Sequence, residues 1–497
     1  MKKINFKYIF AGILFSVVLS SCNDLDRYPG DSIELSQSFK SVKDAATWNN
    51  GLYSLFRGRV YGSFTQPGDI MADQLNSTLD YGNRNGSFQR LDFQTDDQTI
   101  GPVWASYYNG ITNVNVAIAG FENITPADDN EQAALDSYKG DAYFARAYFY
   151  AELAKRFCDA YDSSNAASQL GLPILLTYDI NNWPARSSLQ ETYQQILSDI
   201  DQAKTLLSGV SGEQGANYFN EDVVLALEAR VKLYMQDWTG AKTAADKLIS
   251  SGTYPLIKDA AKFQDMWYED YSQEDIMQVF VSAPNELANT NSVYLGFNAG
   301  LGDAGRYDPD FLPSQWVIDM YDDNDIRKNT YFKNLPVTIQ GLEYEDLTLV
   351  NKYPGNPIYF TGANTNYEQA PKVFRIAEMY LISAEAAYKS SGDALTPLND
   401  LRTARGLTAL SGVSGDALYQ AIKDERFREL AFEGFRYWDL KRWGEGYTRK
   451  DPQNLDVINV GSEFNTLSVS AGDYRFTWPI PSNDITVNTN LVQNAGY

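Results

Sequence analysis

Pairs of short helices joined by a tight turn restrict the fold of this chain more than any other feature. Residues 221–235 and 241–250 both show helical periodicity, and Gln236–Gly240 joins them. Alanines lie where the two helices would touch, at Ala226, Ala229, Ala241 and Ala245. Small residues at such contacts are typical of tetratricopeptide-like hairpins. The pattern recurs over residues 384–405, so we predict an all-α fold built on helical hairpins.

The hairpins are scattered along the sequence and not tandem, which indicates one irregular helical domain. Helical periodicity predicts three scaffold regions, at about residues 40–61, 104–252 and 371–445. Two other regions, about 62–102 and 253–370, lack that periodicity and are rich in Gly, Pro, Asn, Asp and aromatic residues. Loops on a rigid scaffold commonly carry function. We therefore predict that these loop-rich regions bind the ligand, within a single domain covering residues 22–497.

Composition excludes several classes of function. The chain has 41 Lys and Arg against 64 Asp and Glu, a formal net charge of −23. Nucleic-acid binding needs a basic face, so we predict no nucleic-acid partner. The sequence contains no histidine, which excludes histidine-dependent nucleophilic catalysis and histidine-ligated zinc.

Two short patterns suggest a nucleotide or a calcium ion, and both lack the required context. Gly300–Gly305 matches the Gly-x-Gly-x-x-Gly pattern, but no strand and helix are predicted to flank it. Asp322–Asp325 is acidic, but the glycine and glutamate positions of a calcium-binding EF-hand loop are Arg327 and Lys333. We predict neither a cofactor nor a metal.

The N-terminus predicts export and lipid attachment. Three lysines precede an apolar run from Tyr8 to Leu19, which is too short to span a bilayer and fits a secretory signal at residues 1–21. The run ends in Leu-Ser-Ser before Cys22, which resembles a bacterial lipobox, so we predict acylation of Cys22. The signal holds three lysines and no acids, so its removal changes the formal charge from −23 to −26.

Aromatic and polar side chains in the two loop-rich regions are the candidate ligand contacts. Aromatic residues on irregular, polar sequence are more often exposed at a site than those in a helical stripe. On this basis we predict a binding site that contains Tyr81, Asn83, Arg84, Phe88, Trp267, Tyr294, Tyr307 and Trp316.

Three glutamates four residues apart, Glu425, Glu429 and Glu433, would stack on one helix face. Such a face could supply the two carboxylates of a glycosidase. Arginines and large aromatic residues interrupt it, with Arg426, Arg436 and Arg442 available to neutralise the acids. This composition favours a buried ion-pair network between helices over a catalytic pair.

Several segments together resemble the SusD/RagB family of Bacteroidetes outer-membrane lipoproteins. The C-terminal signature is carried by Glu425-Arg426, Glu429-Leu430, Phe432-Glu433-Gly434, Arg436 and Asp439–Gly444. Further similarity lies at Gly140–Ala142, Arg146–Tyr148, Leu153–Asp159, Phe374-Arg375, Glu378–Ile382, Ala384–Ala386, Trp478–Pro481 and Gln493–Tyr497. Cys158 stands where the family usually has glycine, and Ala495 where it usually has proline.

This resemblance implies a non-enzymatic, lipid-anchored protein of the outer-membrane surface. It implies binding of an extracellular oligo- or polysaccharide and delivery to a SusC-like TonB-dependent transporter, over which the protein would act as a lid. The family signature marks scaffold positions, so it carries over no ligand contact. An extracellular glycosidase, a peptide-binding protein and a purely structural lid remain alternatives.

Overall fold

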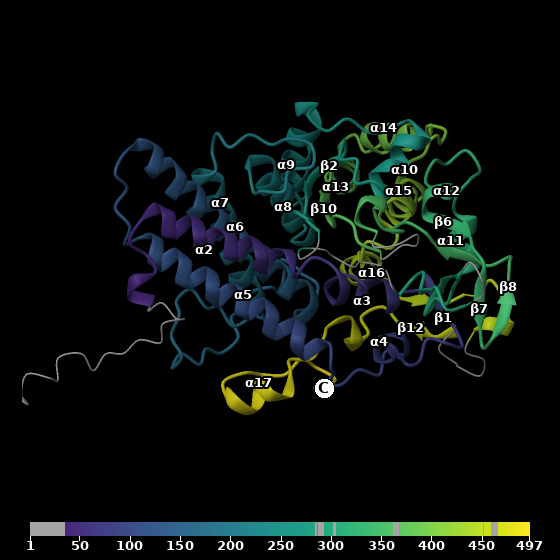
Figure 1. The fold of residues 1–497 in the computed structure, drawn as a ribbon, viewed down its shortest axis with the longest axis horizontal. Coiled ribbons are helices and arrows are strands. Elements are labelled where there is room, and N and C mark those ends of the chain that lie inside the picture. The colour runs from purple at the N-terminus through teal and green to yellow at the C-terminus, as the bar shows by residue number, and fades with distance from the viewer. Residues whose placement is uncertain are drawn as a thin grey trace, which may run out of the picture.

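The computed structural model describes residues 35–283, 286, 293–301, 305–360, 367–450, 452–458 and 466–497. The predicted signal peptide and Cys22 lie outside these residues. Helices dominate the described chain and the strands are short (Figure 1). The predicted all-α class is confirmed. None of the described helices combines the length and hydropathy needed to cross a membrane.

The longer helices form the scaffold. They are α2 (Val42–Arg57), α5 (Ile100–Phe121), α6 (Asp129–Phe157), α7 (Leu189–Leu206), α8 (Glu221–Tyr234), α9 (Trp238–Ser251), α10 (Ala260–Tyr268), α13 (Ile376–Lys389), α14 (Leu395–Ala404), α15 (Gly415–Leu430) and α16 (Arg436–Trp443).

Shorter elements fill the loop-rich regions and the C-terminus. The helices are α3 (Pro67–Ile70), α4 (Gly86–Arg90), α11 (Gln315–Asp319), α12 (Lys328–Tyr331) and α17 (Ser482–Val487). The strands are β1 (Leu75–Ser77), β2 (Asp275–Gln278), β3 (Phe297–Asn298), β4 (Arg306–Tyr307), β5 (Phe311–Pro313), β6 (Phe332–Asn334), β7 (Val337–Ile339), β8 (Leu342–Tyr344), β9 (Thr348–Val350), β10 (Lys372–Arg375), β11 (Tyr447–Thr448) and β12 (Ser468–Val469).

Helices α8 and α9 form the predicted hairpin. The four alanines expected at their contact are all buried. Asp237 caps α9, because its Oδ1 accepts a hydrogen bond of 2.9 Å from the Gly240 amide. The hairpin continues into a second one, since α9 packs on α13 and α13 packs on α14. The helical stripes in the sequence therefore correspond to the packed faces of the scaffold.

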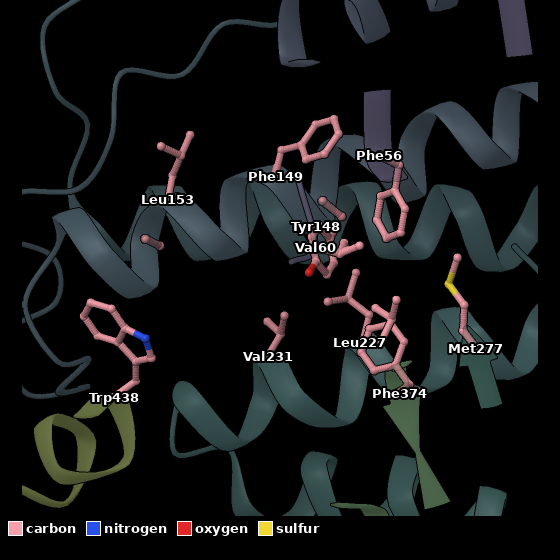
Figure 2. Close-up of a cluster of buried hydrophobic side chains, with 14 of the residues drawn as sticks. Phe56, Val60, Tyr148, Phe149, Leu153, Leu227, Val231, Met277, Phe374 and Trp438 are labelled. Atoms are coloured by element: carbon pink, nitrogen blue, oxygen red, sulfur yellow. The ribbon is translucent and has the colours of Figure 1, made fainter. Parts of the chain in front are cut away.

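The core joins the N-terminal helices to the C-terminal third of the chain. In Figure 2, Phe56 of α2, Tyr148 of α6 and Leu227 of α8 lie in one cluster with Phe374 of β10 and Trp438 of α16. Strand β10 pairs antiparallel with β2, although more than ninety residues separate them. The two halves of the sequence thus share one hydrophobic core.

Residues 62–102 differ from the predicted long surface loop. Residues 67–78 are buried without interruption and include polar side chains such as Asp69, Gln74 and Asn76. Strand β1 pairs antiparallel with β5, so Leu75 lies opposite Pro313. The segment lacks an apolar period because it is enclosed on several sides and its polar groups have specific partners. Gln74, for example, donates a 2.7 Å hydrogen bond to Asp69.

Candidate functional site

The three stacked glutamates of α15 and the turn after it lie inside the protein. Glu425 and Glu429 are fully buried, and the carboxylate of Glu433 is one-tenth exposed. Six cationic side chains surround them in a buried ion-pair network, which consists of the three glutamates with Arg327, Lys352, Arg375, Arg402, Arg405 and Arg428.

Glu429 is the centre of this network. Its carboxylate accepts hydrogen bonds from Arg405 at 2.9 Å, from Arg375 at 2.8 Å and from Arg327 at 3.0 Å. Burial alone would raise the pKa of Glu429, but the guanidinium groups of Arg405 and Arg375 hold that pKa well below its usual range. The acid is therefore ionised and fully engaged.

This network argues against the glycosidase alternative, which relied on two of these glutamates as catalytic carboxylates. A catalytic pair needs an open cleft between its carboxylates, and these acids face arginines in the interior. The expected neutralising partners were wrong, because Arg426 pairs with Asp439, Arg436 with Asp73, and Arg442 with Asp439 and Glu385. The network is scaffold, as the sequence pattern favoured.

A second polar cluster lies where the early segment meets the later loop-rich region, at the right of Figure 1 near β1, β7 and β8. Pairing of β1 with β5 brings the two segments together. Thr78 extends this contact, since its amide donates to the Asp310 carbonyl at 2.9 Å. We call this cluster the loop-end site, and it consists of Asp80, Tyr81, Asn83, Arg84, Tyr307, Asp308 and Asp310.

Arg84 and Asp310 form the strongest contact of the loop-end site. The Arg84 Nε lies 2.9 Å from Asp310 Oδ2, and its NH2 group also donates to Asp310 Oδ1. The Arg84 side chain is 58% exposed, whereas the Asp310 side chain is 7% exposed. Asp310 therefore holds the guanidinium at the surface with part of its edge open to solvent.

Asn83 is also fixed at the surface. Its backbone has a positive φ of 60°, a conformation that asparagine tolerates in turns. Arg90 NH1 donates a 2.6 Å hydrogen bond to Asn83 Oδ1, which leaves the amide nitrogen of the exposed Asn83 side chain pointing away from that contact.

Asp308 carries an unused acceptor. Its Oδ1 atom is buried and has no hydrogen-bond partner. Partial burial, assisted by the charge of Asp80, raises the pKa of Asp308 to about 6, although Arg84 opposes the shift. The backbone is held by a 2.9 Å bond from the Asp308 amide to the Gly296 carbonyl. Gly296 has a φ of +58°, and a Cβ there would lie 2.0 Å from the Asp308 carbonyl oxygen.

Two predicted tyrosines lie at the edges of the loop-end site. Tyr81 is half-buried, with its ring edge-on to Phe311 at 6.2 Å between centroids. Tyr307 is half-buried on β4 and packs edge-on against Phe297 at 5.2 Å. The Arg84–Asp310 contact thus places the segment of Tyr81, Asn83 and Arg84 beside the segment that contains Tyr307, more than two hundred residues further along the chain.

Three other predicted contacts are not on the surface. Phe88 is fully buried and stacks on Trp478 with centroids 5.4 Å apart. Trp267 and Tyr294 are each 1% exposed and line a cavity of about 50 Å³. That volume holds one or two waters and no sugar ring. The assumption that these aromatics are exposed was wrong, because irregular sequence also occurs in the interior of this protein.

Trp316 lies apart from the loop-end site, on α11. Its ring stacks on Phe427 at 5.1 Å, and the ammonium group of Lys450 lies 4.6 Å from the ring centroid. The indole nitrogen donates to the Asp73 carbonyl at 3.2 Å. These contacts place Trp316 with α15, and its assignment as a ligand contact stays a prediction.

The sequence interpretation missed the acidic half of the loop-end site. Asp80, Asp308 and Asp310 were not selected, although Tyr307-Asp308-Pro309-Asp310 directly follows the glycine-rich segment. The signal that could have found them is the pair of aspartates beside a proline and a tyrosine in a loop-rich region. Within the described ranges, these acids do not form a group arranged to hold a metal ion.

A separate open hollow of about 540 Å³ lies beside α10 and α12. Its lining includes Tyr268, Asn329 and Asn334 together with Lys328 and Lys333. The Tyr268 hydroxyl is occupied by hydrogen bonds with Asn351 and with the Thr330 carbonyl. Two aromatic residues line the hollow, Tyr268 and Phe332, but Phe332 is only 6% exposed, so the loop-end site is the better candidate for stacking on sugars.

Comparisons with known protein sequences agree with this architecture. The profile of the family described as "SusD family" matches residues 345–497, and the profile described as "Starch-binding associating with outer membrane" matches residues 25–233. The chain is 26% identical to SusD-like protein P38 of Formosa agariphila over the full length of both. It is 37% identical to the starch-binding protein SusD of Bacteroides thetaiotaomicron over 125 residues, covering 25% of this chain and 21% of that one.

Solved structures show the same fold. A SusD superfamily protein of Bacteroides thetaiotaomicron has a TM-score of 0.77 at 25% identity, covering 91% of this chain and 99% of the other. A putative sugar-binding protein of Bacteroides vulgatus has a TM-score of 0.75 at 24% identity, with 93% and 99% covered. With both family profiles, full-length relatives and the fold in agreement, the chain belongs to the SusD/RagB family.

Proposed function

We propose that this protein captures an extracellular glycan at the loop-end site and delivers it to a SusC-like TonB-dependent transporter, for which it acts as a lid. Acylated Cys22 anchors it at the outer-membrane surface. Membership of a family with a starch-binding, outer-membrane description supports glycan binding. The name of the Bacteroides thetaiotaomicron relative supports it as well.

The Arg84–Asp310 ion pair is the observation that carries this proposal. It fixes two loop segments 226 residues apart into one polar surface with Tyr81 and Tyr307 at its edges. Aromatic faces stack on the apolar faces of sugar rings, and carboxylate, amide and guanidinium groups bind hydroxyls with defined directions.

The charge of the loop-end site favours an uncharged glycan. Each nearby arginine is already paired with an acid: Arg84 with Asp310, Arg90 with Asp92, and Arg306 with Glu343 and Glu345. Asp80 and Asp308 add negative charge without a further cation. Sulfated or uronic-acid-rich polysaccharides would be repelled by such a surface.

Affinity gel electrophoresis tests the site. The purified protein is run in gels that contain amylopectin, xylan, galactomannan, mixed-linkage β-glucan or a sulfated galactan, and the glycan that retards it is kept. With that glycan, the double variant Tyr81→Ala/Tyr307→Ala is expected to bind at least tenfold more weakly, which corresponds to about 1.4 kcal/mol. Tyr178→Ala, at a tyrosine that is 57% exposed elsewhere, is the matched control and is expected to bind normally.

Other outcomes would select another function. Unchanged retardation of the double variant would show that the glycan does not bind at the loop-end site. Retardation by the sulfated galactan alone would contradict the expected preference for an uncharged glycan. Sustained release of reducing ends by the purified protein would establish a glycosidase. Lack of binding to every glycan with retained association with the transporter would indicate a structural or peptide-binding lid.

A further inference from the structure

Exposed apolar side chains are concentrated on one surface, away from the loop-end site. Of the fourteen large apolar side chains that are exposed in the described residues, seven lie in the segment after α6 or at the C-terminus. They are Leu170, Leu176, Tyr178, Ile180, Trp183, Val487 and Val492, with exposures between 39% and 70%. We call these seven residues the apolar surface.

Hydrogen bonds join the two segments of the apolar surface. Asn490 Nδ2 donates to the Trp183 carbonyl at 2.7 Å, and Asn488 Nδ2 donates to the Pro184 carbonyl at 2.9 Å. Arg186 NH1 donates to the Val492 carbonyl at 3.1 Å. Each bond leaves the neighbouring apolar side chain on the outside. The surface is therefore a preformed unit of two segments more than three hundred residues apart in sequence.

The base of this unit is anchored to the scaffold. The Leu175 amide donates to the Tyr150 hydroxyl at 2.7 Å, and Asn115 Nδ2 donates to the Leu175 carbonyl at 2.9 Å. A preformed surface loses little conformational entropy when it binds. The stretch that carries Tyr178 and Ile180 is thus held to the rest of the protein at both ends, at Leu175 and at Trp183.

The composition of the apolar surface is that of a protein interface. Residues 171–185 and 485–497 contain one charged residue, Asp179, in a chain that is 21% charged overall. Depletion of charge together with aromatic residues is the compositional signal of an interface core. The aliphatic members have no flat face for a sugar ring.

A lipid surface fits less well than a protein. Membrane-surface segments combine apolar residues with Lys and Arg that attract anionic lipids. The one cation joined to this surface is Arg186, and its guanidinium is occupied by carbonyl groups of Gly171, Leu170, Phe157 and Val492. The chain as a whole is acidic, so electrostatics would oppose docking on an anionic membrane.

The position of the apolar surface relates it to the membrane anchor. It lies along α5: Tyr108 donates to the Pro173 carbonyl, and Trp104 donates to Asp484 of α17. The described chain begins at the far end of the same helix, where Phe39 packs on Phe121. In Figure 1, α17 and the teal segment after α6 lie on the same side of α5.

The chain between Cys22 and Leu35 spans thirteen residue steps, which reach about 45 Å when fully extended. An acylated Cys22 therefore tethers the whole protein to the outer membrane by a short linker. A partner anchored in the same membrane would meet it at a high effective concentration, so a modest uncharged contact is sufficient for association.

We infer that the apolar surface is the permanent contact with the transporter, made to an uncharged, apolar part of its extracellular face. This inference rests on the proposed function, because it assigns a surface to the proposed partner. It separates two tasks: the apolar surface holds the transporter, and the loop-end site holds the glycan.

Photo-crosslinking in native outer membranes tests the contact. The photoreactive residue p-benzoylphenylalanine is placed at Ile180 of the full-length chain, where the side chain is 70% exposed, and adducts are identified by mass spectrometry. The control is the same substitution at Tyr271, which is 39% exposed and follows α10, on the opposite side of Figure 1 from α17. We expect an adduct with the transporter at Ile180 and none at Tyr271.

A triple variant provides an independent readout. Tyr178→Ser/Ile180→Ser/Trp183→Ser changes exposed side chains, so it is expected to fold normally and to keep its glycan retardation. Transporter recovered with the variant from solubilised membranes should fall at least tenfold. Adducts at Ile180 only with lipid or a second copy of this chain, equal adducts at Tyr271, or undiminished recovery would each overturn the inference. Failure of the unmodified protein to recover any transporter would instead overturn the proposed partner itself.

Discussion

At the scale of single residues, Glu429 shows how much of this fold depends on buried charge. One carboxylate accepts hydrogen bonds from three guanidinium groups that belong to three separate segments. A buried ion pair adds little net stability relative to apolar packing, but removal of one partner leaves the others without compensation in a medium that solvates them poorly. Loss of Glu429 removes one negative charge from three buried arginines. Arg327 then keeps Asp325 and Glu425, Arg375 keeps Glu433, and Arg405 keeps Glu274 as partners.

Glu429→Ala is therefore expected to lower the free energy of unfolding by about 3 to 5 kcal/mol, measured by urea denaturation. The folded fraction should bind glycan normally, because the network lies away from the loop-end site. Asp323→Ala is the control, since Asp323 pairs with Lys328 at the surface and its side chain is 95% exposed. That change should stay within about 0.5 kcal/mol, and an equal loss for both variants would contradict the argument.

The same residues show what the sequence could and could not predict. The structural role of the three glutamates followed from the arginines and aromatics around them, but their partners did not. Arg405, Arg375 and Arg327 lie 24, 54 and 102 residues before Glu429, and nothing local indicates that they converge on it. The candidate contacts show the same limit: Tyr81 and Trp267 both lie in regions predicted as loop-rich, yet Tyr81 is half-buried in a turn and Trp267 is buried on α10.

At the scale of elements, periodic helices were predictable and the short connections between them were not. Helices α7 and α9 have one buried face each, which leaves a 3.6-residue period in the sequence. Helices α6 and α8 are also buried on their other faces, over residues 144–150 and 223–231. The turn between α15 and α16 has no such period. Phe432 and Gly434 there have φ values of +64° and +79°, and the Gly434 amide donates to buried Asp69 at 3.0 Å.

Gly434→Ala tests how tightly this turn is held. A Cβ at Gly434 would lie 2.6 Å from the Thr65 carbonyl oxygen, in addition to the strain of a left-handed backbone, which costs about 1 to 2 kcal/mol. We expect the free energy of unfolding of this variant to fall by clearly more than the backbone strain alone would cost. Gly472→Ala isolates the strain, because Gly472 has a φ of +73° with nothing within 4 Å of an added Cβ. Equal losses in urea denaturation would mean that the clash is relieved by a small shift.

At the scale of the whole molecule, two groups of buried acids respond to pH in opposite ways. Burial raises the pKa values of Asp69, Asp141 and Asp275 to about 7. The folded state therefore takes up protons before the unfolded state does, and stability rises as pH falls through 7. In the ion-pair network, burial would raise the pKa of Glu425, but Arg327 and Arg428 lower it to about 2. That contribution is present above about pH 4.5 and is lost as pH falls toward 2.

The melting temperature is therefore expected to rise between pH 7.5 and pH 5 and to fall below about pH 4.5, measured by differential scanning calorimetry at constant ionic strength. Lower pH also reduces charge repulsion in this acidic chain, which raises the melting temperature in the same way as protonation of Asp69, Asp141 and Asp275. Asp141→Asn separates protonation of the buried acids from the change in net charge. It removes a buried carboxylate that accepts hydrogen bonds from Asn49 and Tyr53, so the melting temperature of the variant should rise less between pH 7.5 and pH 5. If the melting temperature of this variant rises as steeply as that of the unmodified protein, the rise comes from net charge.

The buried ion-pair network also bears on the order in which the chain can fold. Arg327, Arg375 and Arg405 all precede Glu425 and Glu429 in the sequence. In a chain that emerges N-terminus first, Arg327 already has Asp325 as a partner and Arg405 has Glu274, but all three arginines appear before Glu429. Unpaired guanidinium groups do not enter a protein interior. The ion-pair network in the centre of the domain is therefore complete only when about residue 430 has arrived, so this part of the protein finishes its packing late.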